Sequence, residues 1–402
     1  MKTRNSEPIP NARIRARRAY SGPVFLSGAF RPFFLAASVW AIVAIAIWMS
    51  WFNGLIGKDY ALGAHWHIHE MLFGFAAAAV AGFILTAVPN WTGRLPVRGW
   101  SLGALALLWL CGRMAMLVES VFGLSGIGWI DILFLAGLFL VVAREIIAGK
   151  NRRNLVVAGL IGLFALANLL THLDTGSGKD LFGLGWRLGL AMLIMLLALI
   201  GGRITPSFTR NWLSRQGIAQ LPAKPGWADK IALGVSFLAL VGWTIWPMAR
   251  ISGLILMLAG LAQLYRLSRW SGMKTLGEPI VLVLHIGYGW IGIGLILMGG
   301  AILSHLIPAS DAVHALTMGA ASTMITAVAS RASLGHSGRM IRAGKALSLT
   351  YILISVAALF RISYGLVRET SLLDVSGLLW CAGYGIFVAI FIPVWFGPRL
   401  SR

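Results

Sequence analysis

Apolar runs follow one another at short intervals from residue 33 to residue 396 of this chain. A helix needs about 20 mainly apolar residues to cross the hydrocarbon core of a bilayer, and most of these runs have that length. Apolar residues make up 58% of the 402 residues and charged residues only 12%, which leaves too little polar surface for a water-soluble globule. The sequence therefore predicts an all-α, polytopic integral membrane protein.

Counting the runs gives about twelve transmembrane helices in one domain, 33–402, preceded by a basic cytoplasmic segment, 1–32. The predicted helices are 33–52, 68–89, 100–120, 127–148, 154–172, 181–202, 229–247, 250–268, 279–303, 311–330, 346–366 and 375–396. The residues between 203 and 229, rich in proline and arginine, are predicted to form the longest loop.

The loop charges give an independent check on this topology. Segments on the side of the N-terminus hold 27 Lys and Arg residues, whereas the opposite loops hold four. Because loops rich in Lys and Arg stay in the cytoplasm, both termini are predicted to be cytoplasmic. The net charge of +21 is spread among these loops, so the charge predicts no nucleic-acid partner.

Three of the eight histidines, His65, His67 and His69, lie within five residues at the start of the second predicted helix, with Glu70 directly behind them. In a helix, His65 and His69 share one face, and His67 and Glu70 share another. In an extended chain, all three imidazoles share a face. Either geometry can supply nitrogen ligands to a metal ion or a haem iron. The alternative is a polar helix end at the membrane surface.

Other histidines are predicted at the same, outer face. His172 ends the fifth helix, and His305 and His314 flank the turn between the ninth and tenth helices. Asp311, one turn before His314, is a candidate to hold that ring in place. The sequence thus predicts a site at the outer ends of the second, fifth, ninth and tenth helices.

Two histidines are predicted at other depths. His285 lies six residues into the ninth helix, which places it roughly 9 Å inside, with Tyr288 one turn away. An ionisable group at that depth is a functional candidate, and a neutral histidine bonded to a neighbouring helix is the alternative. His336 follows the tenth helix on the cytoplasmic side, too far from His314 for the two to share a metal.

Three arginines, Arg113, Arg187 and Arg361, fall inside predicted helices and need anionic or carbonyl partners. Glu119, backbone carbonyls and haem propionates are the candidate partners. Glu70 is one of few carboxylates expected to be buried, so an ion pump with a carboxylate relay is poorly supported. Cys111 and Cys381, the only cysteines, are predicted to be apolar core residues.

Several short motifs follow one another between Arg31 and about Arg342. They are Arg31-Pro32-Phe33-Phe34, residues 66–75 around His67-Ile68-His69-Glu70, Leu85-Thr86-Ala87-Val88-Pro89-Asn90-Trp91-Thr92-Gly93, Leu284-His285-Ile286-Gly287-Tyr288, His314-Ala315-Leu316-Thr317, and residues 331–339 around His336. In this order and at this spacing, the motifs resemble the NnrS family.

The resemblance implies a bacterial inner-membrane protein that binds haem and copper and is linked to nitric oxide, in denitrification or in resistance to nitrosative stress. It carries over to His67, His69, Glu70, His285, His314 and His336. His172 is kept as a candidate on its position alone.

Three functions follow as hypotheses. The first is a haem and copper protein that binds or turns over nitric oxide near the outer face; turnover, as an oxidoreductase, would require an electron donor. The second is a transporter or delivery protein for copper or a small molecule. The third gives the histidines a structural role only. Respiratory haem-copper oxidases also have twelve helices, but here the sixth helix has no histidine and the seventh lacks a histidine pair.

Overall fold

The computed structural model describes residues 20–174, 183–304 and 306–400, which form helices and no strands. Within these ranges, eleven helices are long and apolar enough to cross a membrane. The segment Ile132–Ala148, with 17 residues, lies parallel to them and follows directly on the short helix Ile127–Asp131. Together these segments match the twelve helices predicted from the sequence and confirm an all-α polytopic membrane protein.

Several of the membrane-spanning segments are built from more than one helical element. In chain order the elements are η1 (Val24–Leu26), α2 (Phe30–Phe52), α3 (Ala64–His69), η2 (Glu70–Ala76), α4 (Ala77–Thr92), α5 (Trp100–Phe122), η3 (Ile127–Asp131), α6 (Ile132–Ala148), η4 (Arg152–Asn154), α7 (Leu155–Asp174), α8 (Leu184–Leu196), η6 (Leu197–Gly201), α9 (Gly202–Arg215), α10 (Trp227–Ile245), α11 (Arg250–Ser268), η7 (Gly272–Thr275), α12 (Pro279–Ser304), α13 (Ala309–His314), η8 (Ala315–Ser322), α14 (Thr323–His336), α15 (Lys345–Val367) and α16 (Ser371–Phe396).

The predicted helix ends are wrong where polar residues extend a helix past its apolar stretch. The sixth predicted helix stopped at 202, but α9 continues to Arg215, with Pro206 inside it. Similarly, α14 continues to His336, which is the last residue of the helix and not part of the following loop. Helix length is set by backbone hydrogen bonds, so hydropathy marks the membrane-embedded part better than the helix end.

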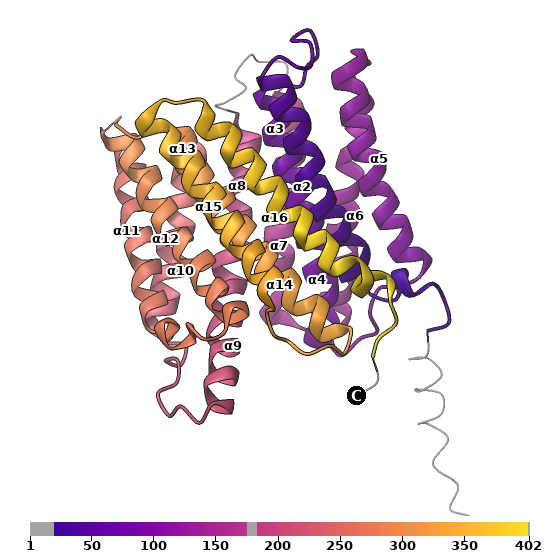
Figure 1. Cartoon of the computed structure of the whole chain (residues 1–402), viewed down its shortest axis with the longest axis vertical. Coiled ribbons are helices and arrows are strands. Elements are labelled where there is room, and N and C mark those ends of the chain that lie inside the picture. The colour runs from indigo at the N-terminus through magenta and orange to yellow at the C-terminus, as the bar shows by residue number, and fades with distance from the viewer. Residues whose placement is uncertain (1–19, 175–182, 305, 401–402) are drawn as a thin grey trace, which may run out of the picture.

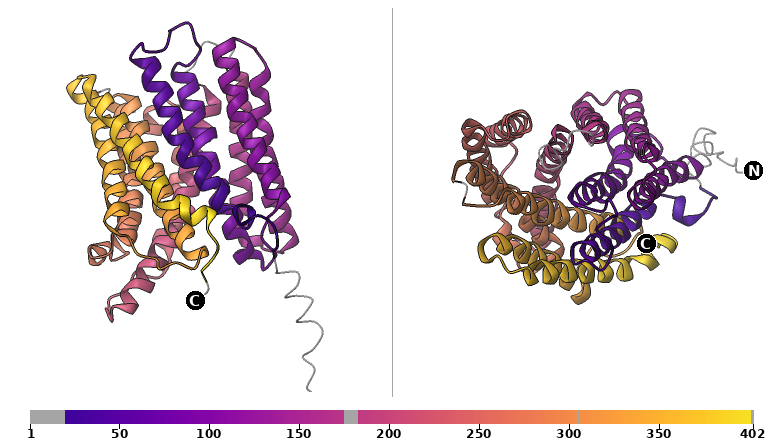
Figure 2. Two further views of the ribbon diagram at one scale, coloured as in Figure 1. Left: turned by 45° about the vertical axis from the view of Figure 1, so that its right-hand side comes forward. Right: turned by 90° about the horizontal axis from the view of Figure 1, so that it is seen from above.

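The helices run roughly side by side, and Figures 1 and 2 show the bundle from three directions. The last helix, α16, packs against the first, α2. Arg31 stabilises this contact, because its Nη1 donates to the carbonyls of Val394, Trp395 and Gly397 at 3.1, 2.6 and 2.7 Å. These carbonyls near the end of α16 would otherwise have no helical partner.

Three membrane-spanning segments contain a π-helical stretch, namely η2, η6 and η8. They belong to the segments Ala64–Thr92, Leu184–Arg215 and Ala309–His336, whose apolar windows are 72%, 67% and 67% buried, whereas α2, α5 and α16 reach only 39%. The π-helical segments therefore lie in the interior of the bundle. Such turns are rare and occur frequently at functional sites.

We call the end of the bundle that carries His67, His69, His172 and His314 the histidine end; it is the upper end in Figure 1, where α3 and α13 lie. The C-terminus lies at the opposite end. The placement of either end in the cytoplasm stays a prediction from the loop charges. Of the predicted N-terminal segment 1–32, residues 1–19 lie outside the described ranges.

Nearer the opposite end, a buried polar network joins α10, α11 and α12 to η6. Arg266 donates to Asp229 Oδ1 at 2.8 Å, to Tyr288 Oη at 2.7 Å and to the carbonyl of Ala198, in η6, at 3.0 Å. Tyr288 donates in turn to Gln263 Oε1 at 2.6 Å. We call this the Arg266 network.

Candidate metal centre

A buried cluster of polar residues lies at the histidine end, where η2, α5, η3 and α7 meet. His69 and Glu70 come from the junction of α3 with η2, Arg113 from α5, Asp131 from η3 and His172 from α7. His69, Glu70, Arg113 and Asp131 are each at most 1% exposed. Burying charged groups is costly unless they are paired, so the pairing within this cluster decides what it can do.

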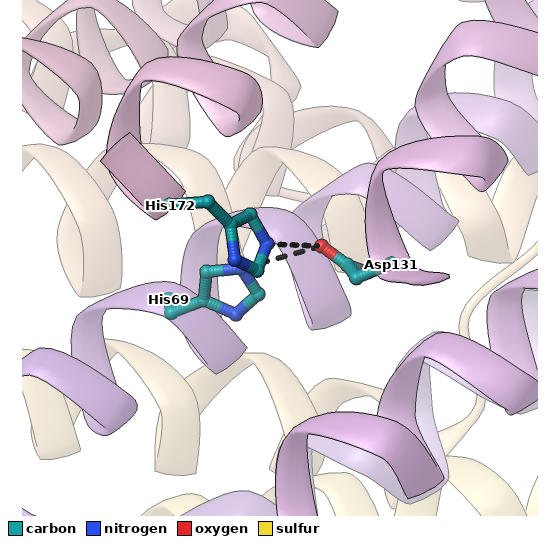
Figure 3. Close-up of side chains that lie close together, drawn as sticks. All are labelled: His69, Asp131 and His172. Atoms are coloured by element: carbon teal, nitrogen blue, oxygen red, sulfur yellow. Dashed lines mark ion pairs between the residues drawn. The ribbon is translucent and has the colours of Figure 1, made fainter. Parts of the chain in front are cut away.

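Three of these residues carry atoms that can bind a metal ion, and the three side chains lie close together (Figure 3). The ligand atoms of His69, Asp131 and His172 all lie within 4.8 Å of one another. Asp131 Oδ2 lies 3.2 Å from His69 Nε2 and 3.7 Å from His172 Nε2. The residues come from three membrane-spanning segments, so the helix packing alone brings them together. We call them the His69 cluster.

His69 faces hydrogen-bond acceptors on both ring nitrogens. Its Nδ1 lies 3.0 Å from Glu70 Oε1, and its Nε2 lies 3.2 Å from both Asp131 Oδ2 and Asn168 Oδ1. The Asn168 amide is oriented by its Nδ2, which donates to Asp131 Oδ2 at 2.7 Å. A neutral imidazole has only one N–H. The other nitrogen therefore either carries an additional proton, which makes the ring an imidazolium, or faces a bound cation.

Around the ligands, a second set of contacts fixes the two carboxylates. Glu70 Oε2 accepts from Arg113 Nη1 at 2.6 Å and from Trp40 Nε1 at 2.7 Å. Arg113 Nη2 donates to Asp131 Oδ1. The carboxylate that bonds to His69 Nδ1 is thus itself held rigidly, which is the usual support for a histidine that binds metal through its other nitrogen.

Two glycines make this close packing possible. A Cβ atom at Gly112 would lie 2.8 Å from Asp131 Oδ1 and 2.9 Å from its Cα. At Gly74 a Cβ would lie 2.7 Å from Trp40 Nε1 and 2.9 Å from Arg113 Nη1. Any larger residue at either position would push the ion pairs apart.

The cluster has an unbalanced charge when its imidazoles are neutral. Glu70 and Asp131 supply two negative charges and Arg113 supplies one positive charge, all of them buried. A bound metal cation or an imidazolium at His69 would supply the missing positive charge. Two imidazoles with one carboxylate form a donor set that suits first-row transition metals such as copper, zinc and non-haem iron.

The other predicted histidines lie apart from this cluster. His67 points to a different neighbour, since its ring stacks on Trp48 with centroids 4.7 Å apart and lies 6.2 Å from the ring of His314. The sequence predicted that His67 and Glu70 share a face of the helix, but the Glu70 carboxylate contacts the neighbouring His69, and His67 contacts Trp48.

Asp311 does not hold His314, contrary to the prediction. His314 Nδ1 lies 2.6 Å from the carbonyl of Ser310, and Asp311 Oδ1 accepts from Arg361 Nη1 at 2.9 Å. Glu119, one of the candidate partners of Arg113, accepts instead from the backbone N–H of Gly128 at 2.6 Å. Helix packing supplies a nearer carboxylate to both arginines.

His285 and His336 lie apart from the His69 cluster and from the His67 and His314 rings. His285 is buried and its Nε2 lies 2.8 Å from Thr209 Oγ1, which fits the alternative of a histidine bonded to a neighbouring helix. Tyr288 joins the Arg266 network instead. His336 is exposed near Phe30, at the opposite end. His305 lies outside the described residues.

Sequence reasoning missed Asp131 and Asn168. Asp131 lies in the first, otherwise apolar part of a predicted helix, and Asn168 precedes His172 by one helical turn on the same face. A polar residue inside an apolar helix is a signal for a buried site. The expectation of few buried carboxylates was also wrong, because Asp131, Glu145, Asp229 and Asp311 are all at most 9% exposed.

Comparison with known proteins agrees with the motifs read from the sequence. The family model described as NnrS protein matches residues 24–399, which is nearly the whole chain. No curated protein matches the sequence. The fold, the membrane-spanning segments and this match lead to one assignment: the chain belongs to the NnrS protein family.

Proposed function

We propose that this protein holds a transition-metal ion at the His69 cluster and acts on nitric oxide through it, by binding or turnover. One observation supports the metal site: His69 Nε2 faces two hydrogen-bond acceptors inside a cluster with an excess of buried negative charge. The connection to nitric oxide rests on the resemblance to the NnrS family.

The contacts around the cluster favour a resident ion over one in transit. Glu70 and Asp131 are both held by Arg113, and Asn168 is held by Asp131. A transport site must release its ion, which is difficult for ligands fixed by so many buried contacts. The transporter hypothesis therefore has less support than a fixed centre.

Copper is the ion that we propose, with non-haem iron as the alternative for the same donors. When bound, either metal supplies a coordination position for a small diatomic ligand. Nitric oxide is uncharged and can approach through the lipid. The residues would keep the proton of His69 on Nδ1, through Glu70, and leave Nε2 for the metal.

Haem remains a prediction from the resemblance. An apolar pocket lies between α4, α8, η6, α9 and α14 and is bounded by residues such as Leu197, Met324 and Val328. Its lining includes no histidine, so no imidazole there could ligate a haem iron. The donor set of the His69 cluster fits a single ion better than a porphyrin.

The test is metal analysis of the detergent-purified protein, followed by optical and EPR spectra before and after anaerobic addition of nitric oxide. His172→Ala removes one ligand, and His336→Ala is the matched control at the opposite end. We expect one copper or iron per chain at this site and a spectrum that changes with nitric oxide. His172→Ala should lose the bound metal and the spectral change with nitric oxide, and His336→Ala should keep both.

A spectrum unchanged by nitric oxide in metal-loaded protein would overturn the nitric oxide part and favour metal delivery. Absence of metal binding in wild type would overturn the whole proposal. It would leave His69 as an imidazolium in a structural ion-pair network, which is the third hypothesis from the sequence.

A further inference from the structure

A partly buried arginine in α14, Arg331, has no anionic partner among the described residues. Its Nε is buried and accepts no partner there. Glu278 is near enough to act on its charge but bonds instead to the backbone N–H of Ala343 at 3.3 Å. By contrast, Arg113 and Arg361 each bond to a carboxylate. A cation held inside a membrane-spanning segment without an anion indicates a site where one can bind.

The side chain of Arg331 is held in place by an aromatic ring of α9. Its guanidinium carbon lies 3.9 Å from the centroid of the Phe208 ring, a distance at which a cation is attracted to a ring face. This contact fixes the guanidinium between the two helices and leaves its N–H groups able to bond to an anion. The fork that they form matches the oxygens of a phosphate group.

The apolar pocket between α4, α8, η6, α9 and α14 ends beside this arginine. Ile204 lines the pocket one turn before Phe208 in α9, and Val328 lines it one turn before Arg331 in α14. Residues three or four apart share a helix face. The pocket and the contact between Arg331 and Phe208 therefore form one continuous surface, which is apolar along its length and cationic at one end.

The pocket has the chemistry and the length of a site for a hydrocarbon chain. Its lining is wholly apolar, and along one segment it extends from Leu193 to Ile204, roughly 16 Å at 1.5 Å per residue. One leaflet contributes about 15 Å to the hydrocarbon core of a bilayer. The pocket is not enclosed, and lining residues such as Val80, Phe83 and Ile204 are only partly buried, so a chain can enter it from the lipid.

The depth of Arg331 fits the headgroup of the same molecule. Arg331 lies five residues before His336, the last residue of α14, which is roughly 8 Å along the helix from its end. This end, the lower one in Figure 1, is the one that the loop charges predict to be cytoplasmic. Anionic lipids are common in the cytoplasmic leaflet. Arg215, which is exposed, is close enough to add a second positive charge.

We propose that one anionic phospholipid binds at this surface, with an acyl chain in the apolar pocket and its phosphate on Arg331. A free phosphate ion would leave the pocket unused, and a neutral lipid would leave Arg331 without an anion, so the two halves together select an amphipathic anion. The bound lipid would join α4, η6 and α14 in the interior of the bundle. This site is separate from the His69 cluster and does not depend on the proposed function.

The test is native mass spectrometry of the full chain, purified in detergent and titrated with phosphatidylglycerol. Phosphatidylcholine is the probe without net charge, and inorganic phosphate is the probe without acyl chains. Arg331→Met removes the cation, Arg331→Lys keeps its charge, and Val328→Trp fills the pocket. Arg342→Met is the matched control, because Arg342 is an exposed arginine near the same end. Thermal unfolding shows which variants are folded.

We expect the wild type to bind one phosphatidylglycerol about 10-fold or more tightly than phosphatidylcholine, as a charge-assisted hydrogen bond would give. Arg331→Met should lose this preference, and Arg331→Lys should keep part of it. Val328→Trp should weaken the binding of both lipids, and Arg342→Met should bind both as the wild type does.

Equal affinity of the wild type for the two lipids would overturn the proposal, and so would wild-type affinity for phosphatidylglycerol in folded Arg331→Met. Displacement of the lipid by inorganic phosphate would also overturn it, because the site would then serve a free anion. A porphyrin or a quinone that remains bound to the purified wild type and is lost in Val328→Trp would assign the pocket to a different occupant.

Discussion

Two buried networks in this bundle are built around an arginine and a carboxylate, yet they differ in charge. In the Arg266 network, Asp229 is matched by Arg266 and also approached by Arg269 at 3.4 Å, while Tyr288 and Gln263 bond to each other. In the cluster around Arg113, two carboxylates share one guanidinium, and His69 faces acceptors on both nitrogens. The first network is complete within the protein, and the second lacks a positive charge.

The comparison separates a structural role from a functional one. A complete network fixes helices relative to one another, and Arg266 does so by bonding to the carbonyl of Ala198 within η6. A network with an unbalanced buried charge is electrostatically unfavourable, and a bound cation can remove that cost.

The largest effect is expected from removing either arginine. Arg113→Met leaves Glu70 and Asp131 buried without a counter-charge, and Arg266→Met leaves Asp229 only the longer contact with Arg269. Breaking a buried pair in this way should lower the free energy of unfolding by about 3–5 kcal/mol in each variant. Added Cu²⁺ should recover part of the loss in Arg113→Met only. Thermal unfolding in detergent measures both effects.

The control for this pair is Arg144→Met, because Arg144 is 67% exposed and its pair with Glu145 should contribute less than about 1 kcal/mol. Equal recovery of both buried variants by Cu²⁺ would remove the distinction between the two networks.

Next in size is the effect of metal on the wild-type protein. An ion that binds only the folded state at 100 times its dissociation constant adds about 2.7 kcal/mol to stability. We expect this gain with Cu²⁺, its reversal by a chelator, and its absence in His172→Ala. An identical gain in His172→Ala would place the ion elsewhere.

Glu70→Gln should weaken metal binding without removing a ligand. The amide can keep a contact with His69 Nδ1 but loses the negative charge, and loss of such a supporting carboxylate typically costs 10–100-fold in affinity. Asp229→Asn, in the Arg266 network, should leave the affinity unchanged. Titration with Cu²⁺ by calorimetry gives both values, and equal effects would contradict the comparison.

The smallest effect is expected for Tyr288→Phe. Its hydroxyl accepts from Arg266 and donates to Gln263, but Arg266 keeps Asp229 and Gln263 keeps a 2.8 Å bond to Ser236. The loss should be about 1 kcal/mol of stability, with no change in bound metal. A change in metal content would connect the Arg266 network to the centre.

The sequence by itself determined the class of fold and most of its helices. Apolar length is a local property, so twelve membrane-spanning segments follow from the runs alone, and the motifs around His69 and His285 identify the NnrS family. The sequence also indicated that His69 and His172 lie at one end of the bundle. These conclusions require no knowledge of which helices touch.

Only the tertiary structure decided which polar residues meet. Asp131 reaches His69 because η3 packs against α5, where Gly112 allows the close approach. His67 and His69, two residues apart in α3, point to different sides of that helix, and the packing of the other segments decides which side chains each one meets. Ligand sets depend on contacts between distant segments, which hydropathy and spacing do not encode.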